Sequence, residues 1–528
     1  MLQVERGDMA RPKLRQIDLR ASFLPMAVLI LGTALWTLII ARTHFKLEDA
    51  FITFRYVANI VSGKGFVFNP GERVLGTTTP LQTLLLALFA YPFGPRSIPA
   101  VATVAMPLAG LLAGLAGYMA LVRRGIPAGG AALGMGLLYT NTGIIRTGIG
   151  GMETPLVLLL MGLSLWALIT RRPIVTGVLC GLLALCRIDG LIWVALIFGA
   201  SLLRSWRDTI KQAGAFVLVL LPWVIFATLY FGSPVPNSMM AKGVVRPGME
   251  HALADLERMV RYGQWFISGT GFSLDWRILP LWIVVLAVGV RKVLQQRPRE
   301  LTVLVVFPPI YALSMYLGRA PRYEWYLIPI TFISLLIAGV GIYEIYRWVA
   351  MTALRRTPAF VNYLIAGVAA VLAVNYAYGA VPMGIRHLRM AQENEDGFRR
   401  VVGLWLYDHT PTDASVAMEA IGYQGYYSER RIVDMAGLVT PRAVGYKRRT
   451  RQNGQIFDWI LRDFKPDYFV LRSFEVDTNR HFNGGPLFLT SEKEQEFRAA
   501  YREAKRFTAP YPDSAPLVRH LTVYERIR

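Results

Sequence analysis

Two adjacent carboxylates, Glu48 and Asp49, follow an apolar run near the N-terminus, and Arg55 stands six residues after Asp49. A carboxylate within ~3 Å of a hydroxyl group can act as a general base, and an arginine presents a planar fork that suits phosphate. The acidic pair could equally be the start of a surface helix, where carboxylates are favoured. The segment that continues to Pro80 is long, polar and aromatic, and long loops without regular structure are often functional.

Charged residues also interrupt apolar stretches farther along the chain. Arg187 and Asp189 lie between two apolar segments, where ionisable side chains are costly and usually functional. They could instead pair with each other or occupy a break between two helices. Glu153 follows Gly150-Gly151, so it either complements the dipole of a helix start or takes part in function.

Four further polar candidates lie in predicted loops or beside spans: Asn237, Lys242, Arg322 and Tyr323. Each has a structural alternative. Asn237 could cap a turn after Pro236, and Lys242 could be a solvated loop lysine. Arg322 heads a span beside Tyr323, where it could bind phosphate or anchor the chain at the lipid headgroups.

The composition argues against an ordinary soluble enzyme. The chain has 528 residues, of which 54% are hydrophobic and only 17% are charged, compared with about 25% charged in average soluble domains. The net charge is +22, and the first 390 residues hold 36 basic and 16 acidic residues. The basic residues form short clusters between apolar runs, as the positive-inside bias predicts, and we find no continuous basic stripe with a nucleic-acid motif. We therefore expect a membrane protein without a nucleic-acid partner.

The elements that must position these residues are apolar spans followed by a polar domain. We predict a polytopic α-helical membrane protein of about 10–12 transmembrane helices with a C-terminal soluble α/β domain. The predicted parts are a cytoplasmic N-terminus (1–22), a transmembrane domain (23–387) with external loops at 43–79 and 232–276, and an external domain (388–528). After a first span at 23–41, we expect spans near 80–93, 98–121, 128–147, 153–170, 174–186, 189–203, 213–231, 277–291, 302–317, 324–345 and 361–380.

The spacing of the basic clusters predicts an irregularity in the early spans. Arg123-Arg124 should be cytoplasmic, which does not fit full crossings at both 80–93 and 98–121, so one early segment is expected to be short, broken or re-entrant. The two cysteines, Cys180 and Cys186, lie six residues apart on a predicted helix. They therefore point to different faces, and we expect no disulfide.

The polar C-terminal part alternates helical and strand patterns. We expect helices at 397–409, 455–464 and 492–501, and strands at 415–418, 432–435, 468–471 and 521–527. A surface helix is expected at 249–266, within the second external loop.

Several stretches in order resemble one known family. The first is Leu47-Glu48-Asp49-Ala50-Phe51-Ile52-Thr53-Phe54-Arg55-Tyr56, followed by Phe68-Asn69-Pro70-Gly71-Glu72. The others are Gly151-Met152-Glu153-Thr154, Arg187-Ile188-Asp189-Gly190, Phe231 to Ser238 with Lys242, and Gly422 to Leu438. Together they resemble the GT-C superfamily of membrane glycosyltransferases, and more narrowly its arabinofuranosyltransferase-like branch. Glu48 stands where that branch commonly has Asp, and Ile188 where it commonly has Pro.

The resemblance implies an inverting transferase that moves a sugar, arabinofuranose in this branch, from a polyprenyl-phosphate donor. The implied acceptor is a cell-envelope glycan, glycolipid or protein on the outer face of a bacterial plasma membrane. It implies Asp49 as the base, with Glu48 as the second choice. The residues that would bind the donor phosphate or substrate are Arg55, Glu153, Arg187, Asp189, Asn237, Lys242, Arg322 and Tyr323. Metal dependence stays open, because Glu48, Asp49 and Glu153 could share a divalent cation, Mg²⁺ or Mn²⁺.

Two other classes remain open at this point. A transporter or a flippase for lipid-linked sugars would also bury charges, but transporters often show repeated halves with broken helices, and we detect no such repeat. Their ionisable residues should also lie near mid-membrane, whereas these lie at the outer ends of predicted spans. A non-catalytic envelope subunit would require that the acidic pair be dispensable.

Overall fold

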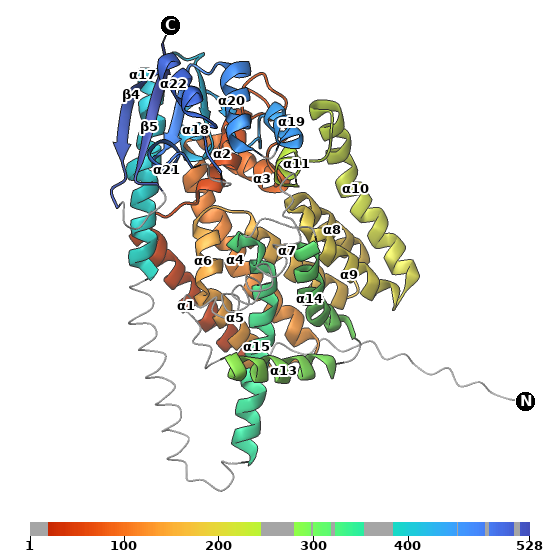
Figure 1. Cartoon of the computed structure of the whole chain (residues 1–528). Coiled ribbons are helices and arrows are strands. Elements are labelled where there is room, and N and C mark those ends of the chain that lie inside the picture. The colour runs from red at the N-terminus through yellow and green to blue at the C-terminus, as the bar shows by residue number, and fades with distance from the viewer. Residues whose placement is uncertain are drawn as a thin grey trace, which may run out of the picture.

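The computed structural model describes residues 19–243, 279–296, 299–317, 323–352, 384–450, 452–480, 485–511 and 518–527. A bundle of helices carries a five-stranded domain at one of its ends (Figure 1). This arrangement confirms the predicted helical membrane protein with a C-terminal α/β domain. The expected helix at 249–266 and the span at 361–380 lie outside the described residues, as do Arg322 and the side chain of Lys242.

The bundle consists of helices of unequal length. They are α1 (Leu19–Thr43), α2 (Glu48–Val61), α3 (Pro80–Ala90), α4 (Ile98–Arg123), α5 (Ala128–Thr140), α6 (Thr142–Ile149), α7 (Thr154–Ile169), α8 (Pro173–Cys186), α9 (Leu191–Leu202), α10 (Trp206–Phe231), α11 (Asn237–Gly243), α13 (Leu279–Leu294), α14 (Thr302–Leu317) and α15 (Ile328–Thr352). Within the described ranges, four helices are long and apolar enough to cross a membrane, and a bent pair could count as a fifth. Several shorter apolar helices accompany them, so the count of 10–12 stays a prediction.

Two predicted early spans are irregular. α3 has only 11 residues, which confirms a short segment in this region. The prediction of a single helix at 128–147 was wrong, because the helix is interrupted at Asn141. The Asn141 side chain accepts a hydrogen bond from the Ile144 amide at 3.0 Å and caps α6. α6 and α7 then meet at a bend of 113°, and Glu153 lies in that bend.

The long helices connect two distinct ends of the bundle. α4 starts beside the C-terminal domain, where the Tyr426 hydroxyl donates to the Pro95 carbonyl at 2.8 Å. Its 26 residues carry the chain about 39 Å away from that domain, to Arg124. There Arg124 and Arg204 both pair with Glu300, which is 3% exposed. Two of the basic clusters predicted to be cytoplasmic therefore meet at the end opposite the C-terminal domain.

The C-terminal domain is built on a mixed sheet with the order β2-β1-β3-β5-β4. Strands β1 (Ser415–Met418), β2 (Arg431–Asp434) and β3 (Tyr468–Arg472) are parallel, and β5 (His520–Arg526) runs antiparallel to both β3 and β4 (Tyr501–Thr508). Its helices are a π-helical turn (Glu395–Arg400), α17 (Val401–His409), α18 (Tyr423–Ser428), α19 (Pro441–Arg449), α20 (Asn453–Phe464), α21 (Ser473–Asp477) and α22 (Ser491–Ala500).

The four predicted strands are confirmed to within one residue at each end, but β4 was missed. β4 is an edge strand that exposes Arg502 to Arg506 and buries little apart from Tyr501. Charged edge strands lack the apolar alternation from which strands are predicted. The predicted helix at 397–409 begins instead with the π-helical turn.

The first long loop completes the core of the C-terminal domain. Phe66, Phe68 and Leu75 are buried in one cluster with Val416 of β1 and Ile432 of β2. Asn69 lies at the free edge of β2, because its amide side chain exchanges two hydrogen bonds of 2.9 Å with the backbone of Ile432. The segment after α2 is therefore part of the C-terminal domain in three dimensions, although about 330 residues separate them in sequence.

The C-terminal domain approaches the start of α2 closely at Gly422. The amides of Gly422 and Tyr423 donate to the Glu48 carboxylate at 2.7 and 3.0 Å. A Cβ atom on Gly422 would lie 2.1 Å from the Glu48 backbone oxygen, so no side chain fits there without moving one of the two backbones.

We expect Gly422→Ala to destabilise the docked domain by about 1–3 kcal/mol, the usual cost of overpacking. The loss of stability would be measured as a lower melting temperature of the detergent-purified protein. Proteolysis between bundle and domain should also be faster. Gly445→Ala in α19 is the matched control, because a Cβ there meets no atom within 4 Å. Equal melting temperatures for the two variants would contradict this account of the docking.

Candidate active site

Asp49 lies in the first turn of α2, where the helical bundle meets the C-terminal domain. Its side chain is half-buried, and the carboxylate is favoured by the helix dipole. The charge of Asp49 acts on two groups from other parts of the chain, the Tyr323 phenol and the Arg399 guanidinium. Asp49 therefore stands where three separate segments converge.

The neighbouring carboxylate, Glu48, is engaged by the C-terminal domain. Besides accepting the two backbone amides, it pairs with Arg399 at 3.6 Å. Arg399 also pairs with Glu395 at 3.0 Å. Burial lowers the pKa of Arg399, but the carboxylates of Glu395, Glu48, Glu419 and Asp49 outweigh burial, so its pKa is raised. These contacts favour a docking role for Glu48 and leave Asp49 as the stronger candidate base.

Arg55 is committed to backbone carbonyl groups. Its Nε donates to Phe68 at 2.8 Å, and its two terminal nitrogens donate to Gly425 and Arg430. The side chain is 4% exposed and lies over the Phe68 ring at 4.6 Å. Burial, the largest cause, lowers its pKa to about 10. These contacts support an anchor between the first loop and the C-terminal domain rather than a ligand for phosphate.

Asn237 also joins separate segments. Its amide nitrogen donates to the carbonyls of Gly437 and Leu438 at 2.7 and 3.0 Å, and its backbone N–H donates to Leu75. Asp434 holds the same turn by accepting from the amides of Ala436 and Val439. The stretch from Gly232 to Asn237 therefore contacts the stretch from Asp434 to Leu438, although the two are about 200 residues apart in the sequence.

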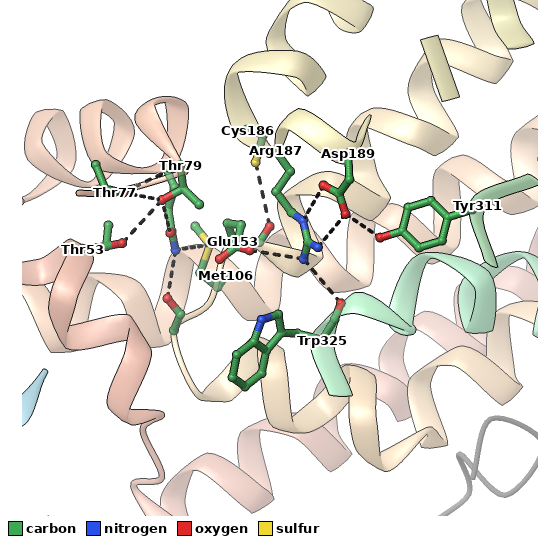
Figure 2. Close-up of polar contacts among 12 residues, drawn as sticks. Thr53, Thr77, Thr79, Met106, Glu153, Cys186, Arg187, Asp189, Tyr311 and Trp325 are labelled. Atoms are coloured by element: carbon green, nitrogen blue, oxygen red, sulfur yellow. Dashed lines mark hydrogen bonds and ion pairs between the residues drawn. The ribbon is translucent and has the colours of Figure 1, made fainter. Parts of the chain in front are cut away.

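The charged residues at the other bends form a buried ion network (Figure 2). Arg187 donates to both oxygens of Asp189 at 3.0 and 2.7 Å and pairs with Glu153 at 3.3 Å. Tyr311 of α14 donates to the same carboxylate of Asp189. Arg187 and Asp189 lie in the break between α8 and α9, so both structural alternatives considered for them from the sequence occur together.

Glu153 holds the cap position of α7, but its side chain makes no capping hydrogen bond. It points to Arg187 instead (Figure 2).

A second set of polar contacts reaches this bend from α2. Thr53 and Thr79 are 3.4 Å apart, Thr79 lies 3.5 Å from the amide of Gln82, and Gln82 donates to the Gly151 carbonyl at 2.9 Å. The acidic helix start and the arginine network are thus parts of one polar region.

Tyr323 stacks on Trp325, with ring centroids 4.6 Å apart and planes 10° from parallel. The Trp325 carbonyl accepts a hydrogen bond from Arg187 at 3.4 Å, and the Arg187 guanidinium lies over the Tyr326 ring. Burial raises the pKa of Tyr323 to about 12, with further contributions from the charges of Asp49, Glu419 and Tyr326. The aromatic segment formed by Tyr323, Trp325 and Tyr326 therefore contacts Arg187 and also lies within electrostatic reach of Asp49.

Three residues near Asp49 or at the sheet edge were not predicted from the sequence: Arg399, Glu419 and Arg472. Glu419 directly follows β1, and Arg472 ends β3. The two form an ion pair, and Arg472 also pairs with Glu475 at 2.6 Å. A signal was available, because ligand-binding residues of α/β sheets collect at the carboxyl ends of parallel strands. Which end faces the bundle could not be read from the strand pattern.

The metal site that the sequence allowed does not form among the described residues. No three His, Cys, Asp or Glu side chains gather there in an arrangement that could hold an ion, and Glu153 is turned toward Arg187. The predicted absence of a disulfide is confirmed, since Cys180 and Cys186 are both free and buried. A cavity of about 360 Å³ beside β2 is lined by Glu72, Arg431, Arg442 and Phe464, among others, and includes neither Asp49 nor Arg187.

Comparisons with known proteins agree with this architecture. A family model described as a domain of unknown function (DUF8728) matches residues 386–524. The terminal β-(1→2)-arabinofuranosyltransferase of Mycobacterium tuberculosis is 30% identical over 226 residues, which cover 37% of this chain and 34% of that protein. The chain thus spans about a third of the length of this curated relative.

Two solved structures share the fold. The archaeal oligosaccharyltransferase AglB from Archaeoglobus fulgidus, in complex with an inhibitory peptide and a dolichol-phosphate, has a TM-score of 0.59 at 12% identity and covers 86% of this chain and 70% of AglB. ArnT from Cupriavidus metallidurans bound to undecaprenyl phosphate has a TM-score of 0.55 at 13% identity over 94% of this chain and 97% of ArnT. The chain has the GT-C fold, as the resemblance implied.

We expect Arg55→Lys to lower the melting temperature by several degrees, because lysine cannot reach three carbonyls in a fixed fork. Affinity for a lipid phosphate, measured on the folded protein, should be unchanged. Arg73→Ala is the control: Arg73 is exposed in the same loop and lies over the Tyr230 ring. If Arg55→Lys keeps its stability but binds lipid phosphate poorly, Arg55 is a phosphate ligand after all.

Proposed function

We propose that the protein is an inverting membrane glycosyltransferase that moves a sugar, arabinofuranose, from a polyprenyl-phosphate donor to a cell-envelope acceptor. The observation that carries this proposal is the position of Asp49. In a chain with the GT-C fold, it is a half-buried carboxylate at the junction of bundle, aromatic segment and C-terminal domain. The partial match to an arabinofuranosyltransferase supports the choice of sugar.

Asp49 acts as the general base. Its carboxylate takes the proton of an acceptor hydroxyl while that oxygen forms a bond to the anomeric carbon of the donor. The bond from the anomeric carbon to the phosphate oxygen breaks, and its electron pair leaves on the phosphate. The products are the glycoside of inverted configuration and the polyprenyl phosphate, and Asp49 then releases the proton to solvent.

The leaving phosphate gains negative charge and needs cations to stabilise it. We assign this task to Arg187, together with Lys242 and Arg322. As the structure stands, every nitrogen of Arg187 has a partner, and two of the partners are carboxylates. The donor phosphate must therefore displace Glu153 or the Trp325 carbonyl from Arg187, and Asp189 keeps the guanidinium in place. The lipid phosphates named for AglB and ArnT support a donor of this class.

We place the C-terminal domain and Asp49 on the external side of a bacterial plasma membrane. Arg124 and Arg204 meet at the opposite end of the bundle, and basic residues between spans favour the cytoplasm. α1 ends at Thr43, three residues before Lys46, whose backbone amide donates to Gln392 of the segment that leads into the C-terminal domain. The start of α1 therefore lies toward the cytoplasmic end.

The direct experiment is a transfer assay with the purified full chain, a panel of polyprenyl-phosphate sugars and an acceptor glycan, with and without a chelator. Release of polyprenyl phosphate coupled to a new glycoside is expected with the arabinofuranosyl donor. Transfer from a different sugar would correct only the identity of the sugar. The absence of transfer from every donor would refute the enzyme assignment.

We expect Asp49→Asn to reduce transfer at least about 100-fold, the lower range for loss of a general base, while donor binding changes little. Turnover under saturating donor and acceptor is the measurement. Asp413→Asn, in an exposed loop of the C-terminal domain, is the matched control and should retain full activity. Near-normal turnover of Asp49→Asn would show that Asp49 is not the general base.

Substitutions of Arg187 and Glu153 should change donor affinity in opposite directions. Arg187→Gln is expected to weaken donor binding about tenfold or more, because a charge-assisted contact to phosphate is lost. Glu153→Gln removes the negative charge that the phosphate must displace from Arg187 and should strengthen binding. Binding of polyprenyl phosphate, measured by titration in detergent, reads out both variants, with Arg204→Gln at the far end of the bundle as control. If both variants melt earlier but bind alike, the network is purely structural.

A further inference from the structure

We propose that Glu419, which the C-terminal domain contributes, binds the acceptor and selects a neutral, hydroxyl-rich glycan. The inference rests on the proposed function, because it names the acceptor side of the Asp49 site. Glu419 does not take the proton. It accepts hydrogen bonds from acceptor hydroxyls and so holds one of them toward Asp49.

The backbone places Glu419 beside Asp49. Glu419 follows the carboxyl end of β1, and Gly422, three residues later, donates to Glu48 at 2.7 Å. Three residues span at most about 11 Å, and Asp49 is the next residue after Glu48. The docking contact that fixes α2 against the sheet therefore also brings the carboxyl edge of the sheet to the candidate base.

Two side chains, Tyr323 and Arg399, are each affected by the charges of both Asp49 and Glu419. Tyr323 and Arg399 come from different segments, one from the bundle and one from the C-terminal domain. Both therefore lie within electrostatic reach of both carboxylates, which agrees with the placement derived from the backbone.

The ion pairs around Arg472 leave Glu419 available for a ligand. Arg472 pairs with both Glu419 and Glu475, so two carboxylates share one guanidinium. Glu475 is the more buried partner, with 1% of its side chain exposed against 16% for Glu419. Glu475 also accepts from the Arg472 amide at 2.8 Å. Glu475 can therefore neutralise Arg472 while Glu419 turns an oxygen toward an acceptor.

The surroundings of Glu419 match the chemistry of a neutral sugar. Carboxylates accept hydrogen bonds from hydroxyl groups, whereas the negative charges of Asp49 and Glu419, which both act on Tyr323, repel an anionic ligand there. Tyr323, which is 37% exposed, has one ring face on Trp325 and offers an aromatic surface of the kind that packs against the apolar face of a sugar. A glycan that carries carboxylate or phosphate groups would meet repulsion at this position.

The test measures glycan binding directly, so that it does not depend on turnover. The full-length protein is titrated with an octyl arabinofuranoside disaccharide and with its carboxylate-bearing analogue, and binding is followed by saturation-transfer NMR. The wild type should bind the neutral glycan more tightly than the analogue. Glu419→Gln should weaken binding of the neutral glycan about tenfold and reduce or abolish the discrimination. Asp413→Asn, in an exposed loop of the C-terminal domain, is the matched control and should leave the ratio of the two affinities as in the wild type.

Transfer kinetics give the second readout. Glu419→Gln should raise KM for the acceptor about tenfold and leave KM for the polyprenyl-phosphate donor unchanged. Unchanged glycan affinity in Glu419→Gln, or equal binding of the neutral and anionic glycans by the wild type, would overturn the proposal. Binding that follows these expectations in a protein that transfers no sugar would refute the proposed function and leave Glu419 as a glycan-binding residue.

Discussion

The structure depends on one contact, the Glu48 carboxylate held by the backbone amides of Gly422 and Tyr423. It joins the first helix after the first span to a loop more than 370 residues later. A charge-assisted hydrogen bond to backbone amides is strong where water is largely excluded. Because Asp49 is the next residue, the same contact fixes the candidate base against the C-terminal domain. Arg55, about two turns after Glu48 in α2, also connects this helix to the C-terminal domain, but as a donor to backbone carbonyls.

Charge is distributed in the bundle according to the cost of burying it. At the end away from the C-terminal domain, Glu300 is shared by Arg124 and Arg204. At the other end, Arg187 is shared by Asp189 and Glu153. Each network compensates its buried charges, since an uncompensated charge there would cost several kcal/mol. The Arg187 network has one excess anion, whereas in the far network Arg204 has a second carboxylate partner, Asp208, at 3.9 Å. The far network is the one that we propose to be cytoplasmic, and in the proposed mechanism a lipid phosphate must compete with Glu153 for Arg187.

The sequence was informative about which residues matter and less informative about what each one does. Glu48, Asp49, Arg55, Asn237 and the Arg187 pair were all picked out from the residues. In space, Glu48, Arg55 and Asn237 join the bundle to the C-terminal domain, and their partners are mostly backbone atoms. A backbone carbonyl or amide has no sequence signature, so a residue that binds one resembles a ligand-binding residue. Glu419 and Arg399 were missed for a related reason, because their importance follows from which edge of the sheet faces α2.

The sequence by itself determined the membrane bundle, the α/β domain and most element boundaries. These follow from hydrophobic periodicity and from the cost of placing charge in lipid, both of which are local properties of the chain. It also singled out the acidic pair, because two carboxylates are conspicuous among 16 acidic residues in the first 390. It also ranked Asp49 above Glu48 as the base, but only the tertiary structure supplied the physical difference between them. Long-range packing placed a glycine loop against one carboxylate and left the other half-buried beside Tyr323. That choice depends on the angle at which two distant segments meet, which no local pattern encodes.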